Sequence, residues 1–183
     1  MKTRNLIGIS LFCALTAAGG MIKLPGPLVP VTLQTLFVYL SGSLLGARYG
    51  AYSQCLFLGL GLIGLPIFAM GGGFSYVLQP TFGYLASFPA AAWIIGKLGQ
   101  DSAEDMNWKT GWLPYVSGML IIFGVGVLYL FFNMNWIIHQ KITFSHALWS
   151  GMILFLPGEL IKMSLAFVLV KRLKPLNLNI SDP

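Results

Sequence analysis

Residues 151–170 read GMILFLPGELIKMSLAFVLV, a stretch long and apolar enough to cross a membrane as one helix. A crossing needs about 20 predominantly apolar residues. Only Glu159 and Lys162 interrupt the stretch, and side chains three residues apart share one face of a helix. Placing a charged side chain at the centre of a bilayer costs about 2.5–3.5 kcal/mol on the membrane-insertion scale, which gives lower costs than other estimates. We therefore expect these two charges to pair with each other, to face a cavity, or both.

Pro157 and Gly158 stand directly before the charged pair. They free backbone polar groups that lipid cannot satisfy, so the protein itself must supply partners for them. The stretch therefore predicts a polar pocket cut into a membrane helix.

The composition is that of an integral membrane protein. Of the 183 residues, 56% are hydrophobic and 9% are charged, whereas soluble domains carry about 25% charged residues. We expect one membrane domain over residues 1–183. The net charge of +6 does not indicate nucleic-acid binding, because the bases are not gathered into one stripe. The first residues also have the charged and apolar parts of a secretory signal peptide, but the membranous sequence downstream favours retention as a first helix.

The pattern predicts an all-α integral membrane protein, a six-transmembrane-helix bundle with both termini cytoplasmic. The expected helices cover approximately residues 5–21, 31–46, 51–65, 81–96, 112–132 and 147–170. Three prolines within residues 25–30 predict an ordered extended loop there. A tight turn is expected at residues 45–50, and residues 68–81 form a loop that mixes glycines with aromatic residues. Only residues 100–110 read as a conventionally soluble segment.

The orientation follows from the basic residues. Six crossings place both termini on one side, which then carries Lys2, Arg4, Arg48, Lys97, Lys109, Lys171, Arg172 and Lys174, while the other side carries Lys23 and Lys141. Cytoplasmic loops are enriched in Lys and Arg. We therefore expect a multi-pass protein of the cell membrane with its substrate site open to the extracellular side.

The sequence contains no motif typical of catalysis or of metal binding. The chain has no phosphate-binding P-loop, no HExxH and no G-x-S-x-G. His139 and His146 lie in a polar loop without a third ligand, so we expect neither a metal nor a catalytic residue. Cys13 and Cys55 lie in apolar runs without metal-binding spacing, which predicts two free, buried thiols.

Two interpretations of Glu159 and Lys162 remain open at this point. One is a buried ion pair that only fixes the last helix against its neighbours. The other is a ligand site, in which Thr32, Gln34, Gln79 and Tyr84 supply neutral polar groups and aromatic residues of the outer loops, among them Phe74, supply apolar cover. An intramembrane enzyme with Glu159 as acid or base and a proton-coupled carrier that uses the same pair as a relay are less favoured alternatives.

A stripe of small residues, Ser10, Ala14 and Ala18, recurs every four residues on the first helix. Such stripes let two helices approach closely. By itself the stripe is compatible with packing inside the bundle and with docking against another subunit.

Five segments resemble BioY, the biotin-specific S component family of energy-coupling-factor (ECF) vitamin transporters. They are PGPLVPVTLQT (25–35), GSLLG (42–46), GLGLIGLPIF (59–68), PTFGY (80–84) and PGELIK (157–162). They follow the order and spacing of the family over residues 24–166. One difference is Glu159, where the family usually has aspartate; the charge is kept and the reach grows by one methylene.

The resemblance implies a six-helix subunit that captures biotin from outside with high affinity, without chemistry or a cofactor of its own. It also implies docking on a transmembrane T component driven by two cytoplasmic ATPase subunits, with Ala14 and Ala18 at that contact. Whether transport strictly requires this module is left open by the sequence.

The predicted site residues suit biotin chemically. Biotin has a ureido ring with two N–H donors and one acceptor, an apolar thioether ring and a carboxylate tail. Glu159 can accept the ureido N–H bonds, and Lys162 or Gln79 can meet a carbonyl or the tail carboxylate. Which end of biotin meets Lys162 is left open by the sequence.

Overall fold

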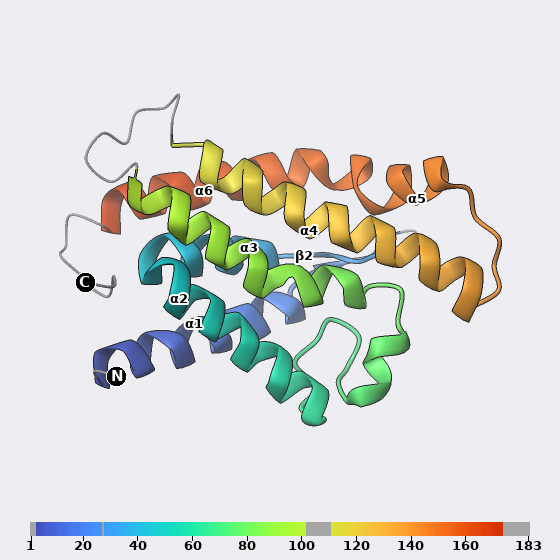
Figure 1. Cartoon of the computed structure of the whole chain (residues 1–183), viewed down its shortest axis with the longest axis horizontal. Coiled ribbons are helices and arrows are strands. Elements are labelled where there is room, and N and C mark those ends of the chain that lie inside the picture. The colour runs from blue at the N-terminus through green and yellow to red at the C-terminus, as the bar shows by residue number, and fades with distance from the viewer. Residues whose placement is uncertain (1–2, 27, 102–110, 174–183) are drawn as a thin grey trace.

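The computed structural model describes residues 3–26, 28–101 and 111–173. Three of the bases used for the orientation, Lys2, Lys109 and Lys174, lie outside these ranges, as does most of the polar segment expected at residues 100–110. In chain order the elements are α1 (Thr3–Met21), β1 (Lys23–Leu24), β2 (Val31–Thr32), α2 (Gln34–Ile63), the 3-10 helix η1 (Phe74–Leu78), α3 (Phe82–Asp101), α4 (Leu113–Phe132), the π-helical turn η2 (Asn133–Ile137), α5 (Phe144–Gly151), the 3-10 turn η3 (Ile153–Phe155) and α6 (Leu156–Leu173) (Figure 1).

Helix α2 is a hairpin of two helical arms that meet at Gly46. Gly46 alone is non-helical, with φ 80° and ψ 179°, a conformation that only glycine adopts readily. The Gln54 amide of the second arm donates a hydrogen bond of 3.2 Å to Ser41 Oγ of the first. These residues are 13 apart, so only a chain reversal brings them together. Two separate helices with a turn over residues 45–50 were expected. In the structure the chain reverses within that range, and Gly46 is the residue with a non-helical conformation.

The extended loop predicted at residues 25–30 is closed by a short hairpin that the sequence did not predict. Lys23 pairs with Thr32 and Leu24 pairs with Val31 in an antiparallel register. The predicted helix start at residue 31 is therefore wrong by three residues. The reason is local: the Thr32 hydroxyl accepts a bond of 3.4 Å from the Gln34 N–H, a side-chain turn that competes with helix.

The last predicted helix, residues 147–170, is broken in the structure into α5, η3 and α6. Pro157 is the second residue of α6. A proline is tolerated in the first turn of a helix because its missing N–H has no partner there in any case. The break consequently falls ahead of the proline, and Glu159 lies in the first turn of α6.

The helices lie alongside one another, and the beginning of α1 and the end of α6 lie at the same end of the molecule (Figure 1). The core joins α2, α3, α4 and α6 through side chains that include Tyr39, Phe57, Ile95, Leu130 and Phe167. Among the described residues, three stretches are long and apolar enough to cross a membrane: Thr3–Met21, Leu113–Ile137 and Phe144–Leu173. Both cysteines are free; Cys13 is buried as predicted, but Cys55 is exposed on the outer surface of α2.

Candidate ligand-binding site

The site is built around an ion pair between Glu159 and Lys162 on the first two turns of α6. Lys162 Nζ contacts Glu159 Oε1 directly. Only 2% of Glu159 and 6% of Lys162 is exposed. Both charges are thus removed from water and need further polar partners.

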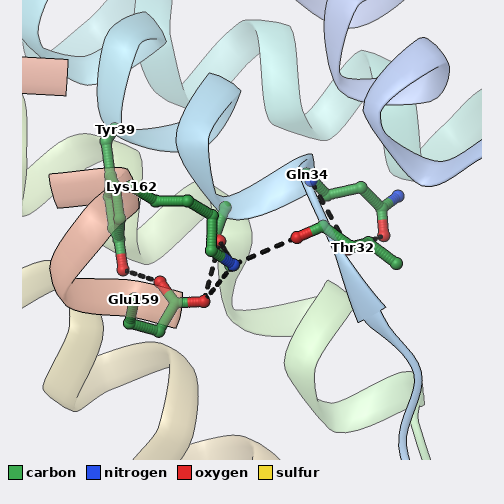
Figure 2. Close-up of polar contacts among 6 residues, drawn as sticks. Thr32, Gln34, Tyr39, Glu159 and Lys162 are labelled. Carbon is green, nitrogen blue, oxygen red and sulfur yellow. Dashed lines mark hydrogen bonds and ion pairs between the residues drawn. The ribbon is translucent and has the colours of Figure 1, made fainter. Parts of the chain in front are cut away.

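The N-terminal arm of α2 supplies the partners of the carboxylate. Thr35 Oγ1 donates to Glu159 Oε1 at 3.0 Å. The Tyr39 hydroxyl donates to Glu159 Oε2 at 2.7 Å (Figure 2). Thr35 and Tyr39 are four residues apart, so they present their hydroxyls from the same face of the helix. Each carboxylate oxygen therefore has a hydroxyl donor.

The ammonium is held as closely as the carboxylate. Besides Glu159, Lys162 Nζ donates to the Thr32 carbonyl oxygen at 3.0 Å and to Thr35 Oγ1 at 2.7 Å. An ammonium has three N–H donors, and here each has an acceptor. We call Thr32, Thr35, Tyr39, Glu159 and Lys162 the polar cluster.

A pocket opens beside the polar cluster. Its empty volume, counted together with the open space at its mouth, is about 520 Å³. The walls come from the β1–β2 segment, α2, the segment after α2, α3, α4, η3 and α6, and they include Val29, Val31, Ala69, Leu85, Phe88, Ile122, Phe123 and Phe155. The pocket is thus apolar over most of its wall, with the charged groups gathered in one part.

Five of the predicted site residues lie in the wall of this pocket, namely Thr32, Gln34, Tyr84, Glu159 and Lys162. The Tyr84 hydroxyl is already engaged, because it donates to the Gly151 carbonyl at 2.9 Å. Gln34 Oε1 accepts from Thr32 Oγ1 at 3.2 Å, while Gln34 Nε2 is buried without a protein partner.

Gln79 and Phe74 are not among the residues that line the pocket. Gln79 is exposed, and 79% of Phe74 is exposed. The segment from which they were chosen does reach the pocket, but through Ala69, Tyr76 and Thr81. The Tyr76 hydroxyl lies 3.3 Å from Thr81 Oγ1. Burial raises the pKa of the Tyr76 phenol, so Tyr76 presents a neutral hydroxyl.

Thr35, Tyr39 and Tyr76 were not among the predicted site residues. For the first two, a signal was present in the sequence: Thr35 and Tyr39 are polar side chains on one face of an otherwise apolar helix. No comparable pattern marks Tyr76, which is one of several aromatic residues in its loop. Within the described ranges, no three His, Cys, Asp or Glu side chains come together in a group that could hold a metal ion.

An apolar chamber among membrane-type helices, with an ion pair and hydroxyl groups in one part of its wall, defines a small-molecule-binding membrane protein. The model of the BioY family matches residues 1–178. The chain therefore belongs to the BioY family, as the resemblance of its motifs predicted.

Individual relatives agree with this assignment. The chain is 46% identical over 152 residues to a probable biotin transporter BioY of Lysinibacillus sphaericus, which covers 83% of this chain and 77% of the relative. It is 36% identical over 174 residues to the biotin transporter BioY of Thermotoga maritima, covering 94% and 97% of the two chains. The crystal structure of the S component for biotin from an ECF-type ABC transporter superposes with a TM-score of 0.73 at 26% identity, covering 96% of this chain and 95% of that one.

Proposed function

We propose that this protein is the biotin-binding S component of an ECF-type vitamin uptake transporter. The observation that carries the proposal is the apolar pocket beside the Glu159–Lys162 pair, in a fold shared with an S component for biotin. The ureido ring of biotin would meet the polar cluster, and its thioether ring and aliphatic chain would fill the apolar part. The relatives described above are named as transporters, so biotin is a cargo that leaves the protein chemically unchanged.

The proposal includes six membrane crossings: α1, the two arms of α2, α3, α4 with η2, and α5 to α6. It places both termini in the cytoplasm. Support comes from the arrangement in Figure 1, where the beginning of α1, the reversal of α2 and the ends of α3 and α6 lie at one end of the molecule. These parts carry Arg4, Arg48, Lys97, Lys171 and Arg172, which is the distribution expected of a cytoplasmic face. The pocket mouth would then open to the extracellular side.

The proposal also includes docking on a T component that is driven by two ATPase subunits. Ser10, Ala14 and Ala18 are all exposed on α1, so the small-residue stripe does not pack inside the described bundle. Of the two interpretations left open by the sequence, the exposure of this stripe supports docking against another subunit.

Binding of biotin to the purified chain tests the proposal. In detergent, isothermal titration is expected to show saturable binding of one biotin per chain. Lipoic acid, which has a carboxylate tail but no ureido ring, is expected to bind at least tenfold more weakly. Lys162→Ala is expected to reduce biotin affinity by more than tenfold, and Lys141→Ala, at an exposed lysine, is the matched control. Normal binding by Lys162→Ala would show that the pocket is assigned wrongly.

Two further measurements separate the competing functions. Recovery of biotin in chemically altered form would favour an intramembrane enzyme. Uptake by vesicles that hold this chain alone, with loss of uptake when the proton gradient collapses, would favour the proton-coupled carrier.

A further inference from the structure

The donors of Lys162 are already used within the protein. Its three N–H groups are taken by the Thr32 carbonyl, the Thr35 hydroxyl and the Glu159 carboxylate. A ligand acceptor could bind Lys162 only by displacing one of them. Glu159 differs, because its two oxygens offer about four acceptor positions and only three are occupied. The polar cluster therefore offers a ligand an acceptor and has no free ammonium donor.

Charge balance leads to the same conclusion. The buried cluster contains one carboxylate and one ammonium, so it is neutral as a unit. A ligand carboxylate placed beside Lys162 would also lie beside Glu159, because the two side chains are in direct contact. The buried site would then hold two negative charges and one positive charge, and an uncompensated buried charge is strongly unfavourable. A ligand with N–H donors at one end and a carboxylate at the other would thus place its N–H end here.

A second cation, Lys23, is bonded to the wall of the same pocket. Lys23 Nζ donates to the carbonyl oxygen of Ala69 at 2.7 Å, and Ala69 lines the pocket. Lys23 also pairs in register with Thr32, a second lining residue. Lys23 itself is exposed and does not line the wall. A carboxylate that contacts this exposed ammonium can thus keep part of its hydration.

We infer that Lys23, and not Lys162, is the cation that binds the carboxylate of the ligand, with Glu159 accepting one N–H donor at the other end. This rests on the proposed function, since it assigns the two ends of the proposed ligand. One N–H of Lys23 bonds to Ala69, which leaves the other two to reach the carboxylate. Lys162 is then a positioning residue that holds the Glu159 carboxylate in its orientation.

The test compares biotin with biotin methyl ester, in which the charge of the tail is removed. Affinities are measured by isothermal titration for the wild-type chain, Lys23→Met, Lys162→Met and Lys141→Met. Lys23→Met is expected to weaken biotin binding at least tenfold and to change ester binding less than twofold. The wild-type chain should bind the ester about as weakly as Lys23→Met binds biotin. Lys162→Met should weaken binding of both ligands by a similar factor, and Lys141→Met should alter neither.

Lys23→Met also removes the bond between Lys23 and Ala69. Loss of that bond would change the affinities for biotin and for the ester alike, so the comparison with the ester controls for it. Equal weakening of both ligands by Lys23→Met, or no weakening of either, would overturn the inference. So would a Lys162→Met chain that loses biotin but still binds the ester. If Lys162→Met does not fold, the Lys23 comparison decides alone. A wild-type chain that binds neither ligand would contradict the proposed function itself, and the inference with it.

Discussion

At the scale of single residues, the buried carboxylate of Glu159 is stabilised by donors from two distant parts of the chain. Lys162 is its neighbour on α6, whereas Thr35 and Tyr39 come from α2, more than 100 residues earlier. A buried ion pair contributes little stability by itself, because desolvation offsets the Coulomb attraction. Hydrogen bonds to the remaining lone pairs are what make such a pair tolerable, so the two hydroxyls are as important as the charges.

The hydroxyl of Tyr39 gives the first prediction. Tyr39→Phe keeps the ring but removes the donor to Glu159 Oε2, and a hydrogen bond to a charged group contributes about 1.5–3 kcal/mol. We expect biotin affinity to fall about tenfold in isothermal titration. Tyr115→Phe is the matched control: its ring packs edge-on against Tyr39 with centroids 5.9 Å apart, but its hydroxyl bonds to Ser43 instead. Equal losses in the two variants would contradict a specific role of the Tyr39 hydroxyl.

The second prediction separates stability from binding at the ion pair. Lys162→Met leaves Glu159 as a buried charge without a counter-ion, and breaking a buried pair in this way costs about 3–5 kcal/mol. In the double variant Glu159→Gln with Lys162→Met, no charge remains to be compensated. We expect thermal unfolding, followed by tryptophan fluorescence in detergent, to show a large drop in Tm for the single variant and recovery of most of it in the double variant.

Biotin binding should not recover with stability. The double variant lacks the carboxylate proposed to accept a ligand N–H, so its affinity should stay at least tenfold below that of the wild-type chain. A double variant that is stable and binds biotin normally would show that the pair has only a structural role.

The sequence indicated five residues of the pocket wall, but it indicated a direct contact only between residues that are close in the chain. The contact of Glu159 with Lys162 follows from a spacing of three on a helix, and it was one of the arrangements expected from the sequence. The contact of Glu159 with Tyr39 depends on how α2 packs against α6, which no local pattern encodes. Gln79 and Phe74 were chosen because their loop carries polar and aromatic residues, but composition does not tell which side chains point inward. In the structure, Ala69, Tyr76 and Thr81 of that segment line the pocket instead.

At the scale of helices and strands, the residues at turns and breaks explain which predictions were correct and which were wrong. The reversal near residues 45–50 was predictable because glycines and polar residues interrupt an apolar run, and Gly46 supplies the required positive φ. The hairpin of β1 and β2 was not predictable, because strands of two residues carry no periodic pattern. The break before α6 was missed because residues 151–156 are continuously apolar, although Pro157 marks its position.

The contact between the two arms of α2 gives the third prediction. A Cβ at Gly50 would lie 2.9 Å from the Cα of Gly42, so even alanine would force the arms apart. At Gly59, in the same helix, a Cβ would meet no atom within 4 Å. We expect Gly50→Ala to lower the Tm of the purified protein by several degrees.

Gly59→Ala is the control for helix propensity, because alanine is favoured over glycine by about 1 kcal/mol in a helix interior. It should leave Tm unchanged or raise it. If Gly50→Ala behaves like Gly59→Ala, the two arms are not in the close contact seen in the structure.

At the scale of the whole molecule, the chain separates the pocket from the exposed stripe on α1. The pocket lies between α2, α3, α4 and α6, and its wall contains no residue of α1. The outward face of α1 exposes Ile7 and Leu11 together with Ser10, Ala14 and Ala18. Substitutions on this face should therefore affect interactions with other proteins or lipid without changing the pocket.

This separation gives the last prediction. Ala14→Trp together with Ala18→Trp adds two large side chains to a face where close helix approach is proposed. We expect uptake of labelled biotin by cells with the complete transporter to be abolished, while the purified variant binds biotin with wild-type affinity. Ala86→Trp with Ala90→Trp on α3 is the matched control, since these alanines are also exposed and also four residues apart. The control pair should preserve both activities, because its face of α3 has no proposed partner. If the α1 pair lost binding together with uptake, α1 would have to support the pocket from within the bundle, and if it retained uptake, the T component would have to dock elsewhere.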